Sequence, residues 1–254
     1  MLEVSIIKCL SDNFSYLIRD TKTKLVGVVD PSEFNPVDLE ISRKYKKLDF
    51  ILNTHHHSDH VGGNLDLKKK YNSKIVCSSY EKNKIPGSEI SMSDKEEFIF
   101  GETTFKIIHV PGHTAGHIIF YTEKDNLVFT GDTLFSMGCG RVFEGTLEQM
   151  HNSLGKIKKL SRNTLIYCGH EYTKNNAKFC LKNDNQNTKL KKRFDTVEEL
   201  LKKNLPTIPI TLAEELETNI FLRCDNKKIK SNLKMEKNSE FEVFSKLRKL
   251  KDQF

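Results

Sequence analysis

The densest group of potential metal ligands in the chain is the run Thr54–His60, Thr-His-His-His-Ser-Asp-His. It contains four of the nine histidines. In an extended or turning segment, residues two apart point to the same side, so His55 and His57 can share one metal ion. Asp59 and His60 would then turn toward a second ion. An isolated run of this kind could also be an exposed loop, so further ligands must be sought elsewhere.

Three further potential ligands follow apolar runs downstream in the chain. Loops at the carboxyl ends of strands converge on one rim of a sheet, where ligands collect. We therefore expect these side chains to meet the first cluster. The three pairs are residues 105–110 with His113, residues 127–131 with Asp132, and residues 165–169 with His170.

The combined set holds too many donors for one tetrahedral metal ion. Two ions that share a bridging Asp132 use every donor and leave space for a bridging water. Nitrogen and oxygen donors without a thiolate favour Zn²⁺, and Fe²⁺ or Mn²⁺ would also fit. The predicted ligands are His55, His57, Asp59, His60, His113, Asp132 and His170.

The composition of the 254 residues, 37% hydrophobic and 30% charged, is that of a folded globular protein. No apolar run is long enough to span a membrane, and the N-terminal residues do not resemble a targeting signal, so we expect a cytoplasmic protein with no membrane partner. The six cysteines form no Cys-x-x-Cys pair. They are expected to be reduced thiols.

Apolar periodicity divides the chain into two parts. Short strand-like runs dominate residues 1–174, and helical spacing dominates residues 175–254. We therefore expect an α/β domain followed by a helical domain. The predicted strands are residues 4–8, 14–19, 25–29, 50–52, 75–77, 105–110, 118–121, 127–130 and 165–167.

The formal net charge of +7 is concentrated near the C-terminus. Residues 181–254 carry 17 Lys and Arg against 12 Asp and Glu, whereas residues 1–180 carry 24 against 22. This excess either covers solvated helix faces or attracts an anionic ligand.

These motifs resemble those of the metallo-β-lactamase superfamily, whose signature Thr-His-x-His-x-Asp-His stands at residues 54–60. Within that superfamily, nearly the whole chain resembles the glyoxalase II family of hydroxyacylglutathione hydrolases. The other segments that carry the resemblance are Gly-His-Thr-Ala-Gly-His at 112–117, Thr-Gly-Asp-Thr-Leu-Phe at 130–135, Cys-Gly-His-Glu-Tyr-Thr at 168–173 and Arg-Lys-Leu-Lys-Asp-Gln-Phe at 248–254.

The resemblance implies an αββα sandwich followed by a C-terminal helical domain that helps to bind glutathione. It also implies a catalytic role for Asp59 and Asp132. The implied metal ligands form two groups of three, with Asp132 bridging them: His55, His57 and His113 for one ion, and Asp59, His60 and His170 for the other.

The resemblance further implies a set of substrate-binding positions, two of which depart from the family pattern. Arg141 stands where Lys is frequent, which preserves the charge but changes its geometry. Phe143 stands where Tyr is frequent, which removes a hydroxyl group and one expected hydrogen bond. The full set is Arg141, Phe143, Tyr172, Arg248 and Lys251.

The implied reaction is hydrolysis of S-D-lactoylglutathione to D-lactate and glutathione, a step of methylglyoxal detoxification. Two metal ions can lower the pKa of a bridging water from 15.7 toward about 7, so no side-chain nucleophile is required. This agrees with the absence of a Gly-x-Ser-x-Gly motif. A thiolate leaves readily because a thiol has a pKa of about 8.5. We expect a small glutathione thioester as the partner, no nucleic acid, and a monomer.

Three other functions fit part of the pattern. An iron-dependent persulfide dioxygenase of the same fold would share the first motif, but the retained Asp59, His60 and His170 argue against its single metal site. A two-metal phosphodiesterase acting on RNA would need a broad basic surface and strong salt dependence. A non-catalytic binding protein is least favoured, because the whole ligand set is intact.

Overall fold

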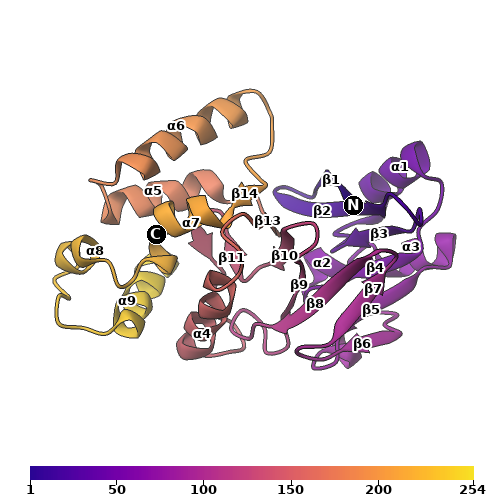
Figure 1. Cartoon of the computed structure of the whole chain (residues 1–254), viewed down its shortest axis with the longest axis horizontal. Coiled ribbons are helices and arrows are strands. Elements are labelled where there is room, and N and C mark those ends of the chain that lie inside the picture. Colours follow the sequence, from indigo (N-terminus) through magenta and orange to yellow (C-terminus); the bar gives the residue numbers. More distant parts are fainter.

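Two six-stranded sheets form the centre of the computed structural model, which describes residues 1–254 (Figure 1). The first sheet has the order β1-β2-β3-β4-β5-β6. Its first three strands pair antiparallel, whereas β3 to β6 run parallel. The strands are β1 (Leu2–Cys9), β2 (Asn13–Asp20), β3 (Val26–Val29), β4 (Phe50–Leu52), β5 (Lys74–Ser78) and β6 (Ile90–Met92).

The second sheet has the order β14-β13-β10-β9-β8-β7. Only β10 and β13 pair in parallel within it. A separate ribbon of β11 (Leu134–Phe135) and β12 (Gly138–Cys139) follows β10. The strands of the second sheet are β7 (Glu97–Phe100), β8 (Thr103–His109), β9 (Ile118–Thr122), β10 (Leu127–Gly131), β13 (Leu165–Cys168) and β14 (Ile210–Thr211).

The alternation of side chains along each strand explains why the sheets stack. On β9, Ile118 and Phe120 pack between the two sheets, whereas Ile119 and Tyr121 pack on the outer face. Successive strand residues face opposite sides, so one apolar run can fill two core layers. Helices α1 (Phe34–Lys44) and α3 (Asn64–Tyr71) cover the first sheet, and α4 (Leu147–Lys158) covers the second. This arrangement confirms the predicted αββα sandwich.

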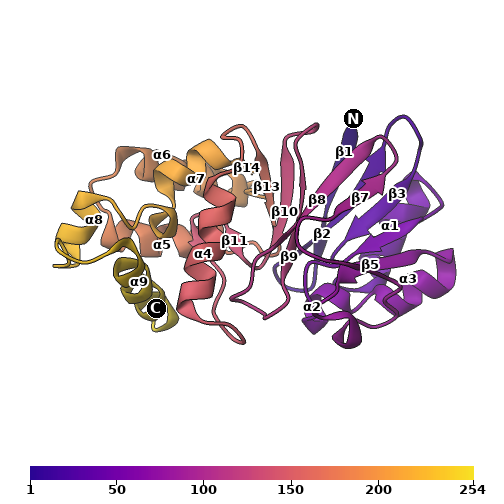
Figure 2. The same ribbon diagram turned by 60° about the horizontal axis from the view of Figure 1, so that its bottom comes forward.

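The residues after β13 are mainly helical and lie beside α4 (Figure 2). They pack against the second sheet, because β14 pairs with β13, and Phe179, Phe221 and Phe244 share one hydrophobic core with Val128. The division into residues 1–174 and 175–254 stays a prediction. The elements of this region are α5 (Thr173–Asn183), α6 (Thr188–Lys202), α7 (Leu212–Thr218), the 3₁₀ turn η2 (Ile220–Leu222), α8 (Lys227–Asn232) and α9 (Glu240–Asp252).

Each apolar run that was predicted to be a strand overlaps an observed strand. Five short strands were not predicted from the sequence, namely β6, β7, β11, β12 and β14. In β7, for example, Ile99 is exposed although it lies between buried Phe98 and Phe100, so the run of apolar residues hides the alternation. No helix combines the length and apolar character needed to cross a membrane.

A buried carboxylate on α7 ties the helical region to the β11–β12 ribbon. Both oxygens of Glu215 lie within hydrogen-bond distance of the Met137 backbone N–H, at 3.0 and 2.9 Å. The Asn219 side chain donates to Glu215 Oε2 at 2.8 Å and to Gly138 O at 2.9 Å. Burial raises the pKa of Glu215 from 4.5 to about 7. The carboxyl group of Glu215 therefore binds its proton more tightly in the folded state than in the unfolded state.

We expect the free energy of unfolding to depend less on pH in Glu215→Gln than in the wild type. Because the folded-state pKa is raised, the stabilisation from this proton is complete below about pH 4.5 and is lost as the pH rises to about 7. A shift of this size corresponds to about 3 kcal/mol at most. Urea unfolding of the wild type should show a falling free energy of unfolding over this range, with a flatter dependence in Glu215→Gln. Equal slopes for the two proteins would contradict this.

Candidate metal centre and substrate pocket

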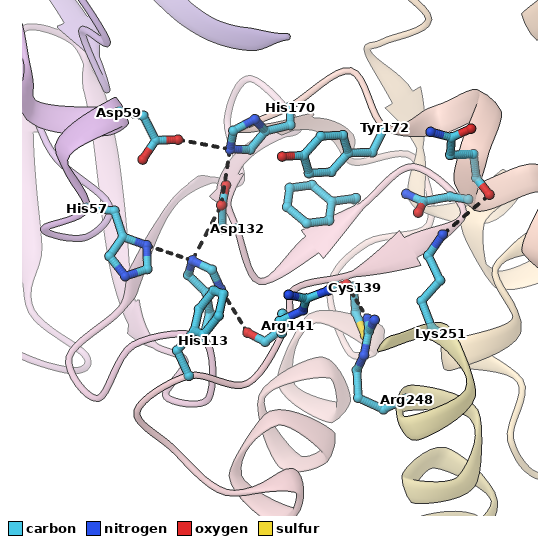
Figure 3. A pocket seen from close by; sticks show the side chains of 14 residues that line it. His57, Asp59, His113, Asp132, Cys139, Arg141, His170, Tyr172, Arg248 and Lys251 are labelled. Atoms are coloured by element: carbon cyan, nitrogen blue, oxygen red, sulfur yellow. Dashed lines mark hydrogen bonds and ion pairs between the residues drawn. The ribbon is translucent and has the colours of Figure 1, made fainter. Parts of the chain in front are cut away.

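The loops that follow β4, β8, β10 and β13 bring the predicted metal ligands to one place. Figure 3 shows those that line the cavity, namely His57, Asp59, His113, Asp132 and His170. Four groups of three residues have potential ligand atoms within 4.8 Å of one another, and two of them match the groups implied by the resemblance. The first group is His55, His57 and His113, and the second is Asp59, His60 and His170.

Asp132 lies between the two groups, directly after β10. Its Oδ1 is 3.3 Å from His60 Nε2. Its Oδ2 is 3.4 Å from His113 Nε2 and 3.3 Å from His170 Nε2. The carboxylate therefore faces histidines of both groups, which is the placement that a bridging ligand requires.

Local backbone structure sets the directions of these side chains. The short helix α2 (Ser58–Val61) begins directly after His57, so Asp59 leaves the chain in a different direction from the preceding loop residues. A Cβ atom at Gly169 would lie 2.2 Å from Asp132 Oδ1, so only glycine leaves room for that carboxylate. Gly131 has a φ of +47°, which favours glycine before the turn into Asp132.

Four ligand histidines have an oriented ring because Nδ1 has a polar partner. With Nδ1 engaged, Nε2 is the atom directed to the centre, as in many metal sites. The pairs are His55 with Thr54 Oγ1 at 3.0 Å, His60 with Asp30 Oδ2 at 3.0 Å, His113 with Arg141 O at 2.8 Å, and His170 with Asp12 Oδ1 at 2.8 Å.

Several atoms at the centre are buried and unsatisfied within the protein. His55 Nε2, His60 Nε2 and Asp132 Oδ1 make no hydrogen bond, and the 3.3 Å contact between the last two lacks hydrogen-bond geometry. Buried polar atoms are costly unless they bind something. Imidazole nitrogens and carboxylate oxygens are ligands of zinc and related divalent ions. The residues therefore fit a dinuclear metal site.

The electrostatics of the two groups differ. Burial lowers the pKa of His55, His57 and His113, which favours the neutral ring that binds a metal ion. Burial also opposes the charged form of His170, but the Asp132 carboxylate outweighs it and raises the pKa of His170 to about 10. Without bound metal ions, the positive charge beside the carboxylates thus comes from protonated imidazoles. Bound cations can replace those protons.

A cavity of about 490 Å³ extends from this centre (Figure 3). Ligands from both groups line one part of it, and basic side chains line another. The structure brings all the predicted substrate-binding residues to this cavity, namely Arg141, Phe143, Tyr172, Arg248 and Lys251.

Helix α9 supplies two of the basic side chains. Arg248 is only 4% exposed, and its guanidinium donates to Cys139 O at 2.8 Å. The Lys251 ammonium lies 5.4 Å from the centre of the Phe179 ring and 5.0 Å from that of Phe254. Aromatic faces attract cations, so the C-terminal residue helps to hold Lys251 at the cavity.

Two aromatic residues connect the cavity to the metal ligands. Tyr172 stacks on His170 with ring centres 4.6 Å apart and an interplanar angle of 5°. Phe143 is 60% exposed, and its ring centre lies 5.3 Å from that of His113. Phe143 therefore offers an apolar surface where a tyrosine would also offer a hydroxyl group.

The sequence analysis missed residues that support the site. Asp30 follows a predicted strand directly, so the strand-end signal used for the other ligands could have identified it. Asp12 has no such local signal, because its role comes from the contact of its side chain with His170 Nδ1, far along the chain. Asn176 is also buried beside the cavity. The cavity-lining residues that were not predicted are Phe135, Cys139, Asn175 and Asn176.

We expect Asp132→Ala to lower the number of bound metal ions, because it removes the carboxylate that faces both groups. Metal analysis of the purified protein should show at least one ion fewer per chain than in the wild type. Asp66→Ala, an exposed position on α3, is the matched control and should keep the wild-type content. Wild-type metal content in Asp132→Ala would exclude the bridging arrangement.

Comparisons with known proteins identify the family. Residues 11–170 match the model of the metallo-beta-lactamase superfamily, and residues 171–254 match that of the hydroxyacylglutathione hydrolase C-terminus. The chain is 51% identical to a hydroxyacylglutathione hydrolase of Pelagibacter ubique (strain HTCC1062), covering 100% of both chains. It is 41% identical to one of Methylococcus capsulatus (strain ATCC 33009 / NCIMB 11132 / Bath), covering 100% of this chain and 99% of the relative.

Among solved structures, the fold is similar to a metallo-beta-lactamase from Staphylococcus aureus subsp. aureus COL. The TM-score is 0.66 at 22% identity, with 99% of this chain and 71% of that one covered. This likeness supports the fold, and the two family models together with the full-length relatives support a closer relationship. The chain belongs to the hydroxyacylglutathione hydrolase family within the metallo-β-lactamase superfamily.

Proposed function

We propose that this protein hydrolyses S-D-lactoylglutathione to D-lactate and glutathione. One observation carries the proposal: a single cavity joins two convergent groups of metal ligands to three basic side chains. The full-length relatives named hydroxyacylglutathione hydrolases support the same activity. The basic side chains are Arg141, Arg248 and Lys251.

We propose two divalent ions, most simply Zn²⁺, with Fe²⁺ or Mn²⁺ as alternatives that suit the same donors. When bound, such ions lower the pKa of a water molecule to about 7 and polarise a carbonyl oxygen. His55, His57 and His113 would hold one ion, and Asp59, His60 and His170 would hold the other. Asp132 would bridge them.

The basic end of the cavity suits the glutathione part of the substrate. Glutathione carries one more carboxylate than ammonium groups near neutral pH, so its net charge is negative. Arg248 is fixed by Cys139, and Lys251 is held by aromatic rings, so neither cation loses much freedom when a carboxylate binds. These contacts would place the thioester carbonyl near the metal ligands.

We propose that Asp59 orients the attacking water. Its Oδ2 accepts a hydrogen bond from Asn13 Nδ2 at 2.9 Å and lies 3.3 Å from His170 Nε2, while the side chain faces the cavity. A carboxylate held in this way would accept a hydrogen bond from the water and direct its lone pair at the carbonyl carbon. Asp132, which is buried deeper, would act by holding the centre together.

The reaction forms a carbon–oxygen bond from water and breaks the carbon–sulfur bond. The electron pair of that bond leaves on sulfur as a thiolate. Thiolates are good leaving groups at neutral pH, since a thiol has a pKa of about 8.5. The products are a hydroxy-acid anion and a thiol, and one proton is released to solvent. No side chain has to act as a dedicated general acid.

We propose that the protein is a monomer, because one chain supplies both groups of ligand residues and all the predicted substrate-binding residues. We also propose a cytoplasmic location. All six cysteines are unpaired and buried, as is usual for proteins of reducing compartments.

The direct test is a turnover assay with S-D-lactoylglutathione, with metal analysis of the same preparation. We expect hydrolysis with release of free thiol, and loss of activity after removal of the metal ions by a chelator. Activity should return when Zn²⁺ is added back. Absence of thiol release from the metal-loaded protein would refute the proposed function.

We expect Lys251→Ala to raise the KM for this thioester about 10- to 100-fold, with a much smaller change in kcat. The reason is that this cation contacts a part of the substrate that does not react, and one charged hydrogen bond contributes about 1.5–3 kcal/mol. Lys249→Ala on the exposed side of α9 is the matched control. An unchanged KM in Lys251→Ala would remove this residue from the substrate site.

A further inference from the structure

Glu81 is a buried carboxylate that lies outside the ligand set, between β5 and the 3₁₀ turn η1 (Lys82–Lys84). Its side chain is 1% exposed. Oε1 accepts the backbone N–H of Gly116 at 2.8 Å, and Oε2 lies 3.0 Å from His56 Nδ1 without hydrogen-bond geometry. A buried carboxylate is costly unless it is well partnered. Both partners of Glu81 belong to loops that carry metal ligands.

These partners connect the loop at residues 54–60 to the loop at residues 112–117. His56 lies between His55 and His57, and Gly116 lies three residues after His113. The two loops together supply the whole first group of predicted metal ligands. Their relative position therefore decides whether that group can bind an ion.

A second carboxylate repeats this connection on the other side of His56. Glu144 Oε1 is 3.4 Å from His56 Nε2, and Glu144 Oε2 accepts the backbone N–H of Ala115 at 3.0 Å. Lys84 Nζ lies 2.9 Å from Glu144 Oε1 and supplies a neighbouring cation. His56 is thus enclosed by two acidic residues, each of which also binds the 112–117 loop.

The packing around Glu81 is fitted closely to its contact with Gly116. A Cβ atom at Gly116 would lie 2.4 Å from Glu81 Cγ, so this approach requires glycine. The neighbouring Tyr80 ring stacks on His109 at 4.2 Å, and His109 Nε2 donates to Ala115 O at 2.9 Å. Glu81 therefore contacts the 112–117 loop directly, and Tyr80 is linked to that loop through His109.

We propose that Glu81 is a positioning residue, which holds the two loops at the separation that the first metal group requires. It would act through His56 and Gly116 and would not touch the substrate. His56, Glu81 and Glu144 also lie close enough to form a small metal site of their own. Positioning is favoured because Lys84 and two backbone N–H groups already engage these carboxylates. This inference rests on the proposed metal centre and is independent of the substrate.

The test measures metal affinity of the whole protein by competition with a chromogenic chelator, using Zn²⁺ as the probe. We expect Glu81→Ala to weaken binding of at least one ion about 10- to 100-fold, as is usual when a group that orients metal ligands is lost. Excess Zn²⁺ should restore kcat without changing the KM for the thioester. Glu81→Ala with wild-type affinity for both ions would overturn the proposal, as would a third tightly bound ion in the wild type.

Two further variants test whether a loss of Zn²⁺ affinity comes from the missing hydrogen bond to Gly116, from the missing charge, or from replacing any glutamate. Glu81→Gln keeps an oxygen to accept the Gly116 N–H, so we expect it to recover most of the lost affinity. A loss in Glu81→Gln as large as that in Glu81→Ala would contradict a role through this hydrogen bond. Glu89→Ala, an exposed position that pairs with Lys68, is the control and should bind Zn²⁺ as the wild type does.

If Glu81→Ala does not fold, His56→Gln provides the same measurement. This variant removes the ring between the two acidic residues and leaves both carboxylates bound to the 112–117 loop. We expect a several-fold loss of Zn²⁺ affinity in a folded protein, as judged by circular dichroism. Wild-type affinity in folded His56→Gln would overturn the proposed link between the loops. Because the readout is metal binding, this result is distinguishable from failure of the proposed hydrolysis.

Discussion

The structure is organised around the burial of the Asp132 carboxylate beside other polar groups. Asp132 is 5% exposed and lies within 3.4 Å of nitrogens from His60, His113 and His170. An unpaired carboxylate at this depth would cost several kcal/mol, so the surrounding imidazoles compensate for the burial of Asp132. Gly169 leaves the space that the Asp132 carboxylate occupies, because the side chain of any larger residue would fill it.

The two sheets meet at the site and together enclose the Asp132 carboxylate. The backbone N–H of Phe14 in the first sheet donates to Gly169 O at 2.8 Å, and that of Ile118 in the second donates to Thr54 O at 2.9 Å. These bonds fasten ligand-bearing loops of one sheet to strands of the other. The ligand geometry is therefore a property of the stacked sheets. Bonds from Glu81 and Asp30 add fixed points within the loops themselves.

The helical region completes the cavity. Arg248 and Lys251 reach it only because α9 shares a hydrophobic core with α4 and the second sheet. Glu215 and Asn219 attach the same region to the β11–β12 ribbon, which carries Cys139 and leads to Arg141. The basic end of the cavity thus depends on contacts between segments far apart in the chain. Fold and substrate recognition are coupled through this packing.

Patterns within the sequence predicted the strand-rich and helical parts and the set of candidate metal ligands. These features are local, because strand alternation and the ligands that follow strand ends both appear within a few residues. The resemblance to a known family added the αββα class and the substrate-binding positions. The residues at those positions line one cavity.

Other features were decided only by the tertiary structure. Strand β14 consists of two residues, and its pairing with β13 has no local pattern. Asp12 orients His170 from 158 positions away, and Glu81 binds a loop 35 positions further along the chain. Such partners are chosen by the packing of the two sheets and the helical region. A carboxylate in a loop has the same local sequence whether it is solvated or buried against a metal-binding loop.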